Sequence, residues 1–129
     1  RHPQVAIASD GGLPVFGKDA THPRAYGNNA RVLGLYVRDR KAISLEEAVR
    51  KMTSLPAGHF RLKGRGLVKE GYAADLVLFD PLRVGDAATF EKPHAWATGF
   101  PFVLVNGIPV IDGGTHTGAR AGQTDADRR

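Results

Sequence analysis

The feature that most constrains this chain is a short apolar run, Val5–Ala8, which ends at Ser9-Asp10-Gly11. A continuously apolar run followed by glycines is typical of a short strand buried on both faces. Such a strand delivers the Asp10 carboxylate to the rim of a sheet, where ligand sites of α/β folds lie. Because Asp10 lies at the start of the chain, its natural partners have to come from residues outside it. The sequence therefore looks like the last part of an enzyme.

The composition fits one globular domain or a piece of a larger one. The 129 residues are 42% hydrophobic and 24% charged, which is ordinary for a globular protein. No apolar stretch approaches the roughly 20 residues of a membrane helix, and the first residues do not read as a signal peptide. The chain has no cysteine, so it offers neither disulfides nor thiolate ligands, and we expect a cytoplasmic location.

The net charge of +5, from 18 basic and 13 acidic residues, does not predict a nucleic-acid partner. The basic residues are scattered along the chain and interrupted by acidic ones. A nucleic-acid-binding surface instead gathers its basic residues on one face or along one helix. We therefore expect a solvated basic surface, with neither nucleic acid nor membrane as a partner.

Two helices are expected after a long polar loop. Residues 11–29 are rich in glycine, proline and polar residues, and long loops without structure of their own are often functional. From Ala30 onward the apolar residues fall on one stripe of a helix. Ser44 followed by Glu47 is a capping box, in which each side chain satisfies the free backbone N–H of the other. The box predicts a second helix, which Pro56 either ends or extends by starting a successor.

The second half of the sequence predicts short strands. Residues 74–81 read as a strand that ends at a turn. Two further apolar runs, 102–105 and 108–111, flank Asn106-Gly107, a pair that supplies the two positive φ angles of a type I′ hairpin turn. Residues from Thr115 on are polar and are expected to be loosely held. A boundary between the helical and the β-rich part is expected near residues 58–66.

Taken together, these motifs resemble the C-terminal portion of the N-acyl-D-amino-acid deacylases, or D-aminoacylases, of the amidohydrolase superfamily. Ala74-Asp75-Leu76-Val77 followed by Val105-Asn106-Gly107 occurs across amidohydrolases generally, whereas the additional His22-Pro23-Arg24 and His116-Thr117-Gly118-Ala119 are more specific to the deacylases. The resemblance covers most of the chain and also rests on Ser9–Gly11, Arg31–Gly34, Ser44–Ala57, Arg65-Gly66 and Gly71–Pro81.

The resemblance implies an α/β fold made of the last strand and helices of a (β/α)8 barrel, followed by part of a small β-sandwich domain. Residues 1–60 would hold strand eight (Val5–Asp10), the active-site loop and the helices. Residues 61–129 would form the sandwich portion with a polar tail. Asp10 would then lie at the C-terminal rim of the barrel, where the active sites of such barrels lie. The missing N-terminal portion of the barrel is accordingly an expected partner.

The resemblance also implies an activity. Members of the family hydrolyse the amide of an N-acyl-D-amino acid to a carboxylate and a free D-amino acid, with a zinc ion that polarises the scissile carbonyl and acidifies a bound water. The aspartate that ends strand eight acts as general base and then as general acid, and Asp10 matches its position. The histidines and the cysteine that bind zinc in the family have no counterpart here, so the isolated chain is expected to be inactive.

Two loop residues are candidate substrate-binding residues. Arg24 can pair with a substrate carboxylate, and His22 can line the same pocket; alternatively both anchor the loop through hydrogen bonds. For Asp10 the alternative is an Asx turn at the end of a strand. The other candidates read as structural: Asp75 as a backbone anchor, and three histidines without ligand-like spacing as surface or loop residues, His59, His94 and His116.

The chain departs from the family pattern at two places. Asn28-Asn29 stand where a hydroxyl residue and an aromatic are usual, which puts loop packing or substrate preference in doubt. His59-Phe60-Arg61 also strays from the usual arginine, aromatic and glycine. Two other functions stay open: another amidohydrolase, such as a dihydroorotase-like or hydantoinase-like enzyme, and a non-catalytic remnant or subunit whose β-rich part pairs with a partner.

Overall fold

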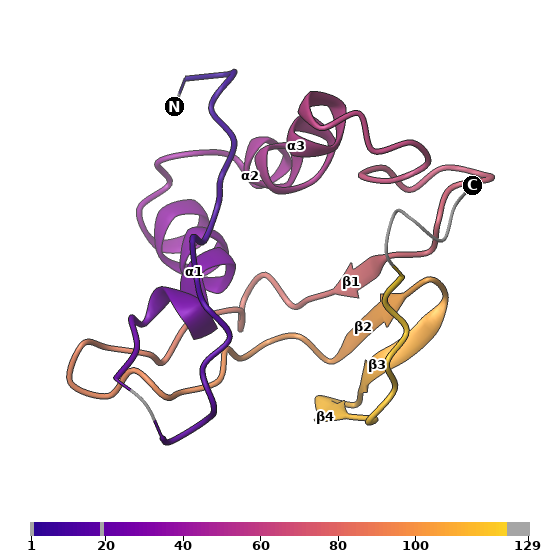
Figure 1. The fold of residues 1–129 in the computed structure, drawn as a ribbon. Helices are drawn as coiled ribbons and strands as arrows, with labels where there is room; N and C mark the ends of the chain where they lie inside the picture. Colours follow the sequence, from indigo (N-terminus) through magenta and orange to yellow (C-terminus); the bar gives the residue numbers. More distant parts are fainter. Residues whose placement is uncertain (1, 19, 124–129) are drawn as a thin grey trace.

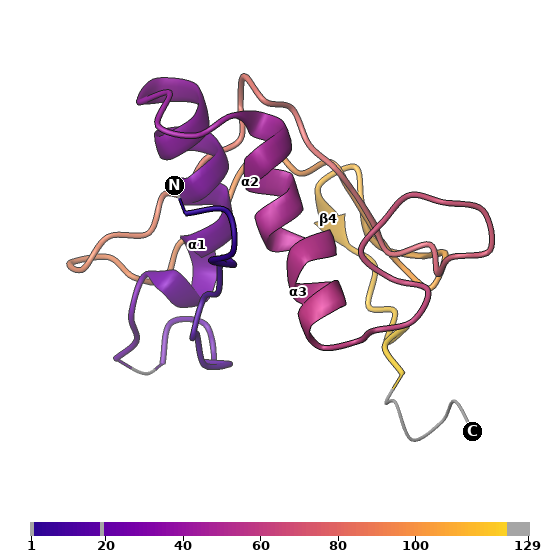
Figure 2. The same ribbon diagram turned by 90° about the horizontal axis from the view of Figure 1, so that it is seen from above.

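Helices occupy one side of the molecule and a small sheet occupies the other (Figures 1 and 2). The computed structural model describes residues 2–18 and 20–123. The helical segments are α1 (Arg24–Arg31), the π-helix η1 (Val32–Asp39), α2 (Leu45–Met52) and α3 (Ser54–His59). The strands β1 (Leu76–Leu78), β2 (Phe102–Val105), β3 (Ile108–Asp112) and β4 (Thr115–His116) follow and form one antiparallel sheet in the order β1-β2-β3-β4. Within these described residues, no helix has both the length and the apolar character needed to cross a membrane.

The expected strand over Val5–Ala8 is not formed. The segment runs beside the helices without regular secondary structure (Figure 1), and Val5 is 60% exposed. A strand needs a neighbouring strand to receive its backbone hydrogen bonds, and the described residues place none beside this segment. Lys51 of α2 holds it instead: its ammonium donates to the carbonyls of His2 and Val5, and its own carbonyl accepts from Ile7 N at 3.1 Å.

The first helix begins earlier than the sequence predicted. Residues 11–29 were expected as one loop, but α1 starts at Arg24, within that range. Pro23 already has helical angles (φ −51°, ψ −28°), and proline suits a helix start because its missing N–H has no partner there. The helix then runs without interruption into η1, so the apolar stripe expected from Ala30 onward is confirmed as helical.

Ser44 begins α2 as the capping motif predicted, since its Oγ accepts the Glu47 N–H at 3.2 Å. The other hydrogen bond of a capping box would join the Glu47 carboxylate to the Ser44 N–H. Here the Glu47 carboxylate instead accepts from the Arg50 guanidinium at 2.6 and 2.8 Å. The hydrogen bond from Arg50 lowers the pKa of Glu47 below its ordinary value. After a break at Thr53, Pro56 lies in the first turn of α3, so it belongs to a successor helix.

The predicted hairpin is confirmed. Asn106 and Gly107 connect β2 to β3 with φ angles of +50° and +80°, which fit the type I′ turn. The expectation that residues from Thr115 on are loosely held is wrong for the first of them. Thr115 and His116 form β4 against β3, and Thr117 bonds the carbonyls of Pro109 and Val110.

The helical and β-rich parts share a core around Val84, which is 1% exposed. Gly34 of η1 packs so closely that a Cβ there would lie 2.8 Å from the Val84 carbonyl oxygen. On the other side, a Cβ at Gly99 would lie 2.6 Å from both the N and the Cα of Val84. Other partly buried apolar residues complete the core, among them Met52 of α2, Phe79 and Phe100.

Gly99→Ala tests this close approach. Gly99 has φ +84°, so alanine adds both left-handed strain and a clash with the Val84 backbone. We expect a loss of about 3 kcal/mol in the free energy of unfolding, measured by urea unfolding with the fluorescence of Trp96, the single tryptophan. Gly114→Ala is the matched control because Gly114 has φ +83° and a Cβ there would have nothing within 4 Å. An equal loss in both variants would show that strain alone, and not contact with Val84, decides the stability.

Candidate active site

The Ser9-Asp10-Gly11 motif forms a tight turn on the first turn of α1. Ser9 Oγ accepts the Gly11 N–H at 3.3 Å, and Asp10 has a left-handed φ of +48°, which aspartate tolerates better than most residues. A Cβ at Gly11 would lie 3.1 Å from Ala25 Cα, so a glycine lets the turn approach the helix. The Asn28 side chain also donates to the Ala8 carbonyl at 3.3 Å. The turn is therefore held to α1 from both sides.

The structure brings Asp10 and Arg24 together. Arg24 Nη2 lies 2.9 Å from Asp10 Oδ2, and the two side chains are 41% and 87% exposed. An open pocket of about 330 Å³ lies beside this pair, and Arg24 and Ser9 line it, although the Asp10 side chain does not. Its other lining residues include Tyr26, Asn28, Ala97 and Phe100. A paired carboxylate and guanidinium thus lie beside a mostly apolar pocket, and the guanidinium side of the pair lines it.

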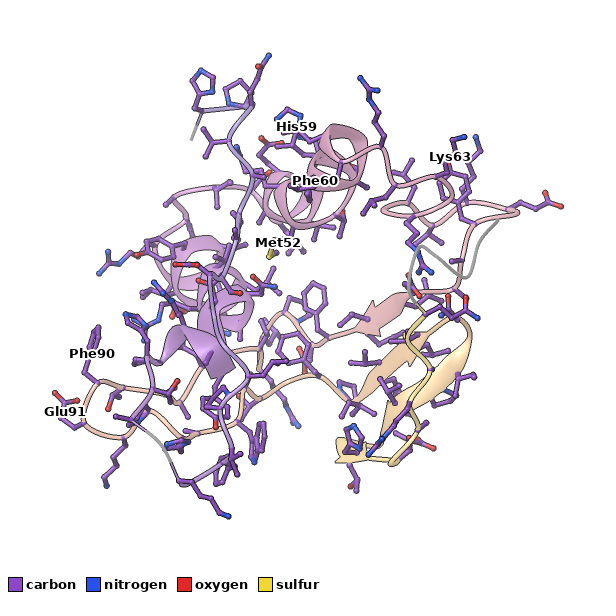
Figure 3. The ribbon with its side chains drawn as sticks, in the orientation of Figure 1. Met52, His59, Phe60, Lys63, Phe90 and Glu91 are labelled. Atoms are coloured by element: carbon purple, nitrogen blue, oxygen red, sulfur yellow. The ribbon has the colours of Figure 1, made fainter. Side chains whose placement is uncertain are left out.

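His22 lies next to this pair but has different contacts. Its Nδ1 accepts the backbone N–H of Arg24 at 3.1 Å, so the ring stabilises the start of α1. The ring also packs edge-on against Phe90, with 4.9 Å between the ring centroids, and Figure 3 shows Phe90 near the tip of an outlying loop. These contacts favour loop anchoring for His22, whereas the Arg24 side chain faces both Asp10 and the pocket. Substrate binding by either residue stays a prediction.

Four aromatic rings whose association the sequence did not predict lie together near the same loop. They form the aromatic cluster, Phe16, Tyr26, His94 and Trp96. His94 lies in a loop, as expected, but its Nδ1 also lies 3.1 Å from Gly17 N and 2.9 Å from the Tyr26 hydroxyl oxygen. No sequence signal could have found the cluster, because Tyr26 and His94 are 68 positions apart and neither belongs to a periodic pattern.

A comparison with known families identifies the chain. The model described as "Amidohydrolase family" matches residues 3–111. The chain belongs to the amidohydrolase family. It is 50% identical over 117 residues to a D-aminoacylase from Alcaligenes xylosoxydans xylosoxydans, a match that covers 91% of this chain and 24% of that protein.

Solved structures agree with this assignment. A crystal structure of a D-aminoacylase superposes with a TM-score of 0.84 at 50% identity, covering 91% of this chain and 24% of that one. An N-acyl-D-glutamate deacylase from Bordetella bronchiseptica, solved with zinc and a phosphonate inhibitor, has a TM-score of 0.79 at 45% identity, covering 84% and 22% of the two chains. The chain thus spans about a quarter of the length of these relatives.

The described part of this amidohydrolase chain does not build a metal site. No group of three or more histidine, aspartate or glutamate side chains lies close enough together to hold an ion there. His59 lies at the end of α3 and His116 in β4, so the structure does not bring these two histidines to Asp10. A zinc ion like that of the Bordetella enzyme therefore does not fit the described residues alone.

Asp75 has the backbone-anchoring role that the sequence predicted. Its Oδ1 accepts the Asn106 N–H at 2.8 Å, at the turn of the β2–β3 hairpin. Its carboxylate also pairs with Arg65, which in turn donates to Asn106 Oδ1 at 2.9 Å. The Asn106 amide reaches the Ala121 carbonyl at 2.7 Å. Asp75, Arg65 and Ala121, which lie in three different segments after the helices, therefore all bond the same hairpin turn.

Asp75→Ala is expected to weaken the hairpin because the Asn106 N–H and the Arg65 guanidinium both lose their acceptor. We expect a loss of about 1 to 2 kcal/mol in the free energy of unfolding, with the partial exposure of the pair limiting the effect. Thermal unfolding followed by circular dichroism measures it. Asp112→Ala, at an exposed position of β3, serves as the control. A variant as stable as the starting protein would contradict the anchoring role.

Proposed function

We propose that this chain is the C-terminal part of a zinc-dependent hydrolase that cleaves the amide of N-acyl-D-amino acids to a carboxylate and a D-amino acid. The observation that carries the proposal is the Asp10–Arg24 pair, in which a carboxylate and a guanidinium meet at 2.9 Å beside a pocket. The similarity to a D-aminoacylase and to an N-acyl-D-glutamate deacylase supports this substrate class. The zinc would be bound by residues of other polypeptide, as the described part of the chain lacks a ligand group.

We also propose that residues 1–60 complete a (β/α)8 barrel and that residues 61–129 contribute to a small β-sandwich. Two exposed apolar surfaces support this division. Val5, 60% exposed, belongs to the apolar run, which has no partner strand among residues 2–18 and 20–123, and Val77 and Leu78 lie exposed on the edge strand β1. Apolar residues and unpaired strand edges of this kind are normally covered by further strands. The missing portion of the barrel would be the partner that covers them.

In the proposed reaction, Asp10 moves one proton. Its carboxylate takes a proton from the attacking water as the water oxygen bonds to the amide carbon. As the carbon–nitrogen bond breaks, Asp10 gives that proton to the leaving nitrogen and returns to its starting state. The second proton of the water leaves the new carboxyl group for the amine, so the products are a carboxylate and a protonated amine. Arg24 would hold the carboxylate of the substrate, a role for which the planar guanidinium is suited. His22 would keep Arg24 in place at the start of α1.

Asp10→Asn tests the catalytic role in a chimera in which this chain replaces the matching quarter of the Alcaligenes D-aminoacylase. The amide cannot accept the proton of water, so we expect kcat/KM for an N-acyl-D-amino acid to fall by about 10²- to 10⁴-fold. Asp112→Asn, which removes an exposed carboxylate on β3, should leave it unchanged. Unchanged turnover in the Asp10 variant would favour a non-catalytic module, and a preference of the chimera for cyclic amides would favour a dihydroorotase-like or hydantoinase-like enzyme.

Arg24→Ala separates substrate binding from loop anchoring. Loss of a charged hydrogen bond to the substrate carboxylate should raise KM by about 10- to 100-fold. The same variant is then assayed with an N-acyl-D-amino acid amide, which has no carboxylate to lose. If Arg24 binds the carboxylate, this second substrate is affected much less. An equal loss for both substrates would show that Arg24 acts by holding the Asp10 turn.

A further inference from the structure

We propose that the aromatic cluster is a latch that positions the loop between Asp10 and Arg24, with His94 and Tyr26 as its positioning residues. The proposal rests on the proposed function, because its consequence is read in the affinity for substrate. It starts from a property of the loop itself. Residues 11–23 connect the two members of the Asp10–Arg24 pair, and a flexible connection of that length would let the pair separate at an entropic gain.

A tight turn in the centre of this loop places Phe16 and Gly17 against the other members of the aromatic cluster. Lys18 N donates to the Val15 carbonyl at 3.1 Å and closes a turn around Phe16 and Gly17. Gly17 has φ +76°, a conformation open to glycine at little cost. The turn presents the Phe16 ring and the Gly17 N–H on the same side, toward His94 and Trp96.

Hydrogen bonds at His94 connect the loop to α1. Nδ1 accepts the Gly17 N–H at 3.1 Å, so this nitrogen carries no proton, and the Tyr26 hydroxyl at 2.9 Å is therefore the donor to it. Tyr26 lies on α1 two residues after Arg24. One imidazole nitrogen thus joins the middle of the loop to the helix that carries the candidate substrate-binding arginine.

Ring packing adds to these hydrogen bonds. Phe16 stacks on Trp96 with 4.8 Å between centroids and 13° between the ring planes. Tyr26 meets Trp96 edge-on at 5.2 Å and Phe16 edge-on at 5.7 Å. Offset-stacked and edge-to-face pairs are the favourable arrangements of aromatic rings. The docked loop is therefore fixed by contacts that lie outside the Asp10–Arg24 pair and do not use either side chain.

A latch of this kind acts on substrate binding. If only molecules with a docked loop bind substrate, the apparent dissociation constant rises as the docked fraction falls, while saturating substrate restores docking. His94→Ala removes the acceptor of both hydrogen bonds and should shift the docking equilibrium by on the order of tenfold. KM should then rise by up to about tenfold, depending on the docked fraction of the starting protein, while kcat changes by less than about twofold.

The experiment measures docking and catalysis separately in the chimera. Hydrogen–deuterium exchange of the peptide that contains Gly17 reports docking, and steady-state kinetics with an N-acyl-D-amino acid report KM and kcat. His94→Ala should speed exchange at Gly17 and raise KM. His94→Asn should restore both, because the asparagine Oδ1 can occupy the place of Nδ1 as an acceptor. Tyr26→Phe, which keeps the ring and loses the hydroxyl, should have an intermediate effect.

His116→Ala is the matched control, since His116 Nδ1 also accepts a backbone N–H, that of Gly118 at 2.9 Å, but in the β-rich part. It should change neither exchange at Gly17 nor KM. Equal exchange at Gly17 in the starting chimera and in His94→Ala overturns the latch. Exchange at Gly17 as fast as in an unstructured peptide, together with an unchanged KM, overturns its positioning role. If Asp10→Asn retains full activity while exchange still depends on His94, the proposed function fails and the docking contact stands.

Discussion

The backbone of Val84 is the contact on which the rest of the structure depends. Gly34 of η1 and Gly99 approach it from two sides, at distances that leave no room for a Cβ. Arg38 adds a hydrogen bond from Nη1 to the Val84 carbonyl at 2.6 Å. The core that forms there joins η1 and α2 to the segments that flank the strands rather than to the strands themselves. The absence of a side chain at these two glycines thus lets a helical part and a β-rich part share one core.

The segment that follows Val84 also holds α1, the helix on which the candidate site is built. Arg31 of α1 pairs with Asp86 at 2.6 Å, two residues after Val84, and a Cβ at Gly27 would lie 2.5 Å from the Asp86 Cβ. The back of α1 is therefore held to the 84–88 segment, while its first turn carries Arg24 and supports the Asp10 turn. The candidate site is built on one helix, and its geometry follows from how that helix is packed.

The features that could be predicted from the sequence are those encoded by neighbouring residues. The Ser44 cap joins residues three positions apart, and the Asn106-Gly107 turn follows from the backbone angles of two adjacent residues. The Asp75 anchor could be predicted only as a role, because its partner Asn106 lies 31 positions away. The errors concern contacts between distant segments. Val5–Ala8 is apolar like a strand but has no neighbouring strand among the described residues, and residues 24–29 are polar enough to read as loop although they form helix.

The same distinction applies to the candidate site. Asp10 was found because a carboxylate followed a strand-like run and because the motifs around it resemble a family. Arg24 was found by that resemblance, and its meeting with Asp10 is new information from the fold. The aromatic cluster was missed because its members come from three separate segments and share no spacing. Single aromatic residues in loops carry no signal until the chain is folded.

The ion pair and the left-handed backbone angle of Asp10 do not measurably stabilise the folded chain. Its ion pair with Arg24 is largely exposed, and such pairs contribute about 0 to 1 kcal/mol. The left-handed backbone angle of Asp10 adds no stability either, although aspartate adopts it more readily than most residues with a Cβ. The turn therefore gains nothing by itself from holding the carboxylate in this position. Lys41 and Arg61 are also charged residues with a left-handed backbone, so this geometry alone does not select a reacting group. Asp10 differs from them in that its carboxylate meets Arg24 beside a pocket, and the proposed catalytic role depends on that meeting.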